Sequence, residues 1–79
     1  MFEELRDRIE RAPDRYPLAR FLEPYLPLVG SPPLYSLYHA LRYNKEYQDA
    51  LQLAVIESET DYRLERVLRM LLKTDSASL

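Results

Sequence analysis

Carboxylates gather at two places in the chain, within residues 3–10 and within residues 57–61, and paired carboxylates are what acid–base catalysis needs. In the first group, arginines are interleaved with the acids at helix-neighbour spacing, so we expect a solvated helix face there. His39 stands alone, and no serine or cysteine can be placed beside it together with a third, orienting group. We therefore expect a half-buried structural histidine and a protein that is not an enzyme.

Composition argues against metals, cofactors and membranes. The chain has no cysteine and a single histidine, which excludes the usual zinc sites, and its single glycine cannot build a phosphate-cradling loop. No apolar run approaches the roughly 20 residues that span a bilayer, and the first residues are acidic rather than basic. We expect no metal, no cofactor, no membrane contact and, by default, a cytoplasmic location.

Four cations, Arg63, Arg66, Arg69 and Lys73, fall on one face of a predicted helix. Such a stripe can be a solvated surface near a helix C-terminus, a contact for an acidic protein, or a grip on a phosphate backbone. The net charge of −2 favours an acidic protein partner over nucleic acid.

The most informative pattern is a surplus apolar face. One stripe at helical spacing, suited to a buried helix face, consists of Tyr47, Ala50, Leu51, Ala54 and Val55. Leu53 and Ile56 lie on the opposite side of the same helix and need a cover of their own. Tyr35 and Tyr43 lie off the main stripes, and tyrosine is enriched at interfaces. The sequence therefore predicts a partner interface at these four residues, with a homodimer as one form of it.

Prolines and capping residues divide the chain into helices. A first helix should end at Ala12, before a proline, and a second should be capped by Asp14 and kinked or ended by Pro24. A third should begin at Ser31, whose hydroxyl can cap it, and stop at Asn44, which tolerates the left-handed conformation. We see no strand signal.

The stretch 57–61 leaves two architectures open. Ser58, followed three residues later by Asp61, resembles a capping box and favours a turn, after which the last helix could fold back over Leu53 and Ile56. Alternatively, apolar residues repeat with an eleven-residue spacing, which suits one straight helix from about residue 45 to residue 73. Serine, threonine and aspartate prefer caps to helix interiors, so the turn is slightly favoured.

Residues 34–50 resemble the helix-turn-helix of a tetratricopeptide repeat. The resemblance rests on Leu34, Leu37, Ala40 and Leu41, followed by the run Lys45-Glu46-Tyr47-Gln48-Asp49-Ala50. It covers less than half of the chain and occurs once, whereas a solenoid needs about three repeats. The resemblance implies an αα-hairpin at Asn44 and adds some weight to a protein-binding role.

Together these observations predict an all-α protein, a small bundle of four or five helices whose last two are separate or merged, with an αα-hairpin near Asn44. We expect one helical domain over residues 1–75 and a frayed tail over residues 76–79. The predicted function is a small protein–protein interaction module of adaptor, chaperone or inhibitor type. The alternative is a nucleic-acid-associated regulator that uses the arginine stripe.

Overall fold

The computed structural model describes residues 1–74, and the predicted tail over residues 76–79 lies outside them. This part of the chain is 78% helical and contains no strand, as predicted. The elements, in order, are α1 (Phe2–Arg11), α2 (Tyr16–Leu22), the 3₁₀ turn η1 (Glu23–Tyr25), α3 (Leu26–Val29), α4 (Pro32–Arg42), α5 (Gln48–Ser58) and α6 (Tyr62–Lys73).

Proline sets the boundaries of the first half of the chain. α1 ends at Arg11 because Ala12, which precedes a proline, is extended with φ −69° and ψ 126°. The cap of α2 is Arg15 rather than Asp14, although the Asp14 carboxylate accepts a hydrogen bond from the Tyr16 N–H. α2 ends at Leu22, and η1, the turn that contains Pro24, follows directly, as the sequence predicted. A single further turn, α3, then closes at a left-handed glycine with φ 68°.

The hairpin between α4 and α5 follows the prediction closely. The Ser31 hydroxyl accepts a hydrogen bond from the Leu34 N–H at 3.3 Å and caps α4. Asn44 adopts φ 53°, and the next N–H, that of Lys45, donates to the Ala40 carbonyl at 2.8 Å. This is the bond of a Schellman motif, which ends a helix where one residue can turn left-handed.

The last two helices are separate, so the alternative prediction of a single helix from about residue 45 to residue 73 is wrong. The cap of α6 is Asp61, whose carboxylate accepts a hydrogen bond from the Leu64 N–H at 3.1 Å. Ser58, the expected cap, is instead the buried last residue of α5 and donates its hydroxyl to the Val55 carbonyl. A serine bonded back to its own helix cannot cap the next one, and the task falls to the aspartate.

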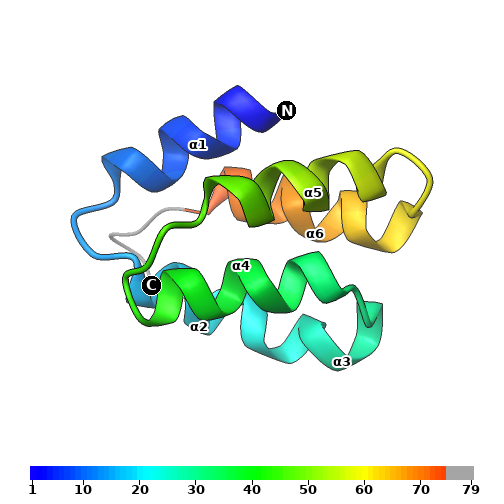
Figure 1. Cartoon of the computed structure of the whole chain (residues 1–79), viewed down its shortest axis with the longest axis horizontal. Coiled ribbons are helices and arrows are strands. Elements are labelled where there is room, and N and C mark those ends of the chain that lie inside the picture. Colours follow the sequence, from blue (N-terminus) through cyan, green and yellow to red (C-terminus); the bar gives the residue numbers. More distant parts are fainter. Residues whose placement is uncertain (75–79) are drawn as a thin grey trace.

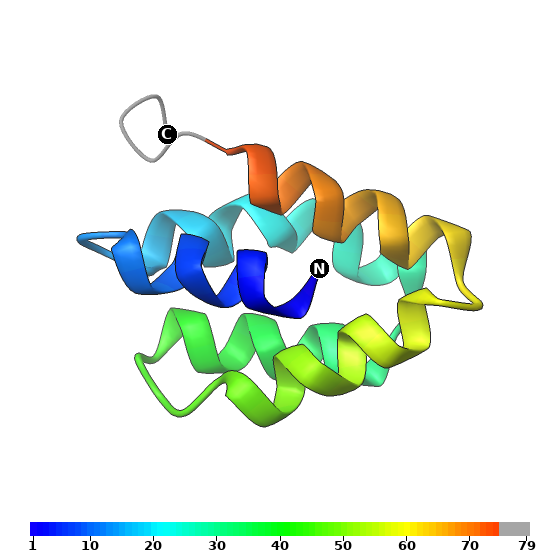
Figure 2. The ribbon, with the colours of Figure 1, turned by 90° about the horizontal axis from the view of Figure 1, so that it is seen from above.

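The helices surround one apolar core. α5 and α6 lie side by side, with α1 on one side of the pair and α2 and α4 on the other (Figure 1). Seen from above, α1 runs over the line between α5 and α6 (Figure 2). The core consists mainly of leucines at helical spacing, among them Leu5, Ile9, Leu18, Leu22, Leu34, Leu37, Leu41, Leu51, Leu64, Leu68 and Leu71. Leu51, on the buried stripe predicted for its helix, is among them.

Candidate protein-interaction surface

The outer face of α5, formed by Asp49, Gln52, Leu53 and Ile56, stays open. Leu53 and Ile56 are 56% and 55% exposed, because α5 turns its opposite side, with Leu51, into the core. The chain does turn after α5, but α6 packs beside α5 rather than over this face. The expectation that a folded-back last helix would cover these two side chains is therefore wrong.

The tyrosines expected at the interface lie on or just beyond α4. Tyr35 is 46% exposed and lines a groove of about 590 Å³ between α4 and α5, opposite Asp49 and Ala50. Tyr43, at the hairpin, is 55% exposed, and its ring lies 4.7 Å from that of His39. His39 is itself exposed, which corrects the expectation of a half-buried histidine. The groove thus adjoins α5, one turn from Leu53.

A cluster of tyrosines around one arginine, which the sequence analysis did not predict, lies beside the hairpin. The Arg42 guanidinium lies 5.7 Å from the Tyr16 ring and 5.4 Å from the Tyr43 ring, and it donates to the Tyr38 hydroxyl at 3.1 Å. That hydroxyl in turn donates to Glu23 at 3.0 Å. The Tyr43 and Tyr38 hydroxyls raise the pKa of Arg42 above its ordinary value. The spacing of four between Tyr38 and Arg42 was a visible signal, whereas the link to Tyr16 was not.

The four cations of the predicted stripe lie on the exposed side of α6, and we call them the α6 basic face. Arg63 donates to the Leu28 carbonyl at 3.4 Å, and the Arg66 guanidinium lies 5.6 Å from the Tyr62 ring. Arg69 pairs with Glu65 at 3.4 Å, an exposed contact of the kind that adds little stability. The face is therefore available to a charged partner.

The position of α5 is fixed by a polar cluster that joins it to α1. The Tyr47 hydroxyl donates to the Glu10 carboxylate at 2.5 Å, and the Arg15 guanidinium both pairs with Glu10 at 3.1 Å and lies 4.9 Å from the Tyr47 ring. Tyr47 is only 3% exposed. Burial, and then the hydrogen bond to Glu10, raises the pKa of Tyr47 above its ordinary value.

A second polar contact, which no sequence pattern indicated, joins α1 to the C-terminal end of α6. Arg8 is 7% exposed, and its Nε donates to the Thr74 carbonyl at 2.8 Å and its Nη2 to the Thr74 hydroxyl at 3.1 Å. The guanidinium thus meets the C-terminal end of α6, where the helix dipole favours a cation. Residues this far apart in sequence carry no local signal of their contact.

Within residues 1–74, no three histidine, aspartate or glutamate side chains converge as a metal site would require. The same part of the chain contains no helix with the length and apolar character needed to cross a bilayer. Fold and surface together define a small all-α bundle with an open apolar face. No protein-family model, curated protein or solved structure matches the chain.

Proposed function

We propose that this protein is a small, non-enzymatic interaction module that acts by binding a surface of another protein through the outer face of α5 and the adjoining tyrosines of α4. The observation that carries the proposal is the exposure of Leu53 and Ile56 at the centre of one helix face. Large apolar side chains that neighbour one another on a surface are typical of interaction sites. The lack of cysteine is compatible with a cytoplasmic setting for this role.

In the absence of another partner, the outer face of α5 is proposed to pair with the same face of a second copy of the protein. If two α5 helices pack antiparallel about a two-fold axis, Leu53 of each copy faces Ile56 of the other, as a closed dimer requires. Because Leu53 and Ile56 are 56% and 55% exposed, further burial of each is worth about 0.8–1.7 kcal/mol, the same fraction of the roughly 1.5–3 kcal/mol for full burial. Two copies then gain about 3–7 kcal/mol, against an association cost of about 4 kcal/mol or more. The homodimer should be weak.

Charge makes the dimer respond to salt in a characteristic direction. The outer face of α5 carries the carboxylate of Asp49 and no cation, so two copies bring like charges together. Added salt screens this repulsion and should strengthen the dimer. Binding of the α6 basic face to a polyanion would weaken with salt instead, because phosphate contacts release counterions.

The test is the oligomeric state measured by sedimentation equilibrium at low and high salt. The net gain of at most about 3 kcal/mol corresponds to a dissociation constant of several millimolar. We expect dimer at millimolar concentration, increasing with salt, and a folded monomer for the variant Leu53→Asp with Ile56→Asp. The matched control is Leu28→Asp with Tyr62→Asp, which changes two side chains that are 65% and 69% exposed on other helices. A wild-type protein that stays monomeric, or a control that dissociates equally, would contradict the proposal.

The α6 basic face is proposed as a second contact, for an acidic region of the protein partner. α6 has four cations and one carboxylate, whereas the whole chain has a net charge of −2. The remainder of the molecule is therefore acidic and opposes approach to nucleic acid. The face is suited to a local acidic patch rather than to a long polyanion.

A further inference from the structure

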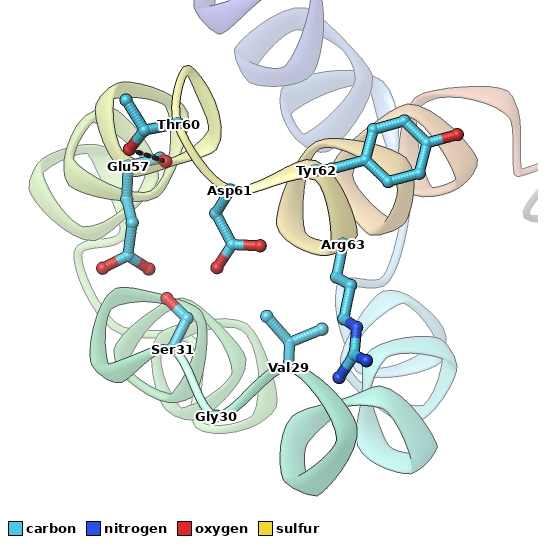
Figure 3. Close-up of a pocket in the computed structure, with 8 residues that line it drawn as sticks. All are labelled: Val29, Gly30, Ser31, Glu57, Thr60, Asp61, Tyr62 and Arg63. Atoms are coloured by element: carbon cyan, nitrogen blue, oxygen red, sulfur yellow. Dashed lines mark hydrogen bonds between the residues drawn. The ribbon is translucent and has the colours of Figure 1, made fainter.

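A pocket opens at one end of the bundle, where the turn between α5 and α6 meets the corner between α3 and α4. Its volume is about 540 Å³, and its lining includes Glu57, Asp61 and Arg63 from α5, the turn and α6, and Val29 and Ser31 from the corner. The carboxylates of Glu57 and Asp61 both point into the space above this corner, and Arg63 lies on the far side, near Val29 (Figure 3). We call this the bundle-end pocket.

Glu57 has a carboxylate oxygen without a partner. Its Oε1 atom has less than 1 Å² of accessible surface and accepts no hydrogen bond from any residue that the structure describes. A buried charged oxygen without a donor is costly, and native proteins rarely leave one unsatisfied. Figure 3 shows this carboxylate directed toward Ser31 at the edge of the pocket. Because this atom is closed to solvent, a donor from outside the described chain can satisfy it only after the side chain rotates.

The neighbouring groups leave room for such a donor. Asp61 uses Oδ1 to cap α6, and none of the hydrogen bonds within residues 1–74 involves its second oxygen. Arg63, the one cation of the lining, donates to the Leu28 carbonyl at 3.4 Å instead of pairing with either acid. The lining therefore carries two carboxylates and one guanidinium, a net negative charge.

We propose that the bundle-end pocket binds the guanidinium of an arginine side chain presented by a protein partner. A guanidinium has five N–H donors in a planar fork, so it can bond to Glu57 and Asp61 at once. The last torsion of a glutamate side chain is soft, so a small rotation offers both oxygens of Glu57. An inorganic cation is a poorer fit, because no third acidic or histidine ligand converges here within residues 1–74.

The surroundings favour an arginine carried by a protein over a small free cation. Tyr62, which belongs to the lining, and Leu28, whose carbonyl accepts from Arg63, are 69% and 65% exposed. A polypeptide that inserts an arginine can cover these side chains, whereas an isolated guanidinium cannot. This inference goes beyond the proposed function and does not need the outer face of α5, since the two surfaces share no residue.

The test is an amide-resolved NMR titration of the full chain with the peptide acetyl-Leu-Arg-Leu-amide. The control peptide has citrulline, the neutral analogue of arginine, in the central position. We expect the amide signals of Gly30, Ser31 and Asp61 to shift with a millimolar dissociation constant for the arginine peptide, and no saturable shift for the citrulline peptide. Equal binding of both peptides, or no shift of these signals, would overturn the inference.

Two matched variants make the test specific. Glu57→Gln keeps the shape of the side chain and should weaken binding at least tenfold, whereas Glu59→Gln, exposed and outside the lining, should leave it unchanged. Arg63→Gln removes the competing cation and should strengthen binding severalfold. Equal effects of Glu57→Gln and Glu59→Gln would refute the assignment, as would displacement of the peptide by millimolar Mg²⁺. The L53D/I56D variant should bind the peptide normally, which separates this result from the fate of the dimer.

Discussion

Replacement of Tyr47 by phenylalanine tests the polar tie that fixes α5 in the bundle. The change removes one hydroxyl, which donates to Glu10 at 2.5 Å from a side chain that is 3% exposed. A hydrogen bond to a charged group contributes about 1.5–3 kcal/mol, and water can replace the lost donor at Glu10, whose side chain is half exposed. We therefore expect the lower value, a loss of about 1.5 kcal/mol in the free energy of unfolding at neutral pH. In a domain of this size, that loss lowers Tm by about 6–12 °C.

The same substitution should change how stability depends on pH. The pKa of Tyr47 is raised by burial and by the bond to Glu10, so the folded protein holds the phenol proton more tightly than the unfolded chain does. Its stabilising effect is complete below the ordinary tyrosine pKa of 10.0 and is lost as pH rises above that value. The stability difference between the wild type and Tyr47→Phe should therefore narrow above pH 10.

Urea denaturation followed by circular dichroism, at neutral pH and at pH values above 10, measures both effects. The matched control is Tyr38→Phe, whose hydroxyl accepts from Arg42 at 3.1 Å and donates to Glu23 at 3.0 Å in an exposed position, where water can replace it. We expect the control to change stability by no more than about 0.5 kcal/mol. Equal losses in the two variants, or a wild-type advantage that stays constant into alkaline solution, would refute the reasoning.

Three further predictions concern the turns. Asp61→Ala removes the cap at the Leu64 N–H and should cost about 1 kcal/mol in urea denaturation, whereas Asp61→Asn keeps an accepting oxygen and should cost less than about 0.5 kcal/mol; equal losses would show that the cap contributes nothing. Gly30→Ala should cost about 1 kcal/mol from the left-handed φ of 68° alone, since no atom lies within 4 Å of an added Cβ. Asn44→Gly, at φ 53°, should leave the free energy of unfolding unchanged or raise it in the same measurement. A Gly30→Ala variant more stable than Asn44→Gly, each relative to the wild type, would contradict the reasoning.

Much of the fold could be read from the sequence because its signals are local. Ser31 caps α4 and Asn44 ends the same helix as expected, since each acts on backbone groups within a few residues of itself. The choice between Ser58 and Asp61 was harder, because both residues can cap a helix. It depended on whether Ser58 was buried at the end of α5, and burial is a property of the packed bundle.

For the candidate surfaces too, the sequence determined some features and the packing of the helices determined others. The sequence alone placed Leu53 and Ile56 opposite the core side of their helix, because helical periodicity fixes which residues share a face. Only the packing of α6 beside α5 decided that this face stays open. The bond between Tyr47 and Glu10 spans 37 positions, and the bundle-end pocket also joins segments that are distant in sequence. Contacts of this kind depend on how whole helices pack, which no local pattern of residues specifies.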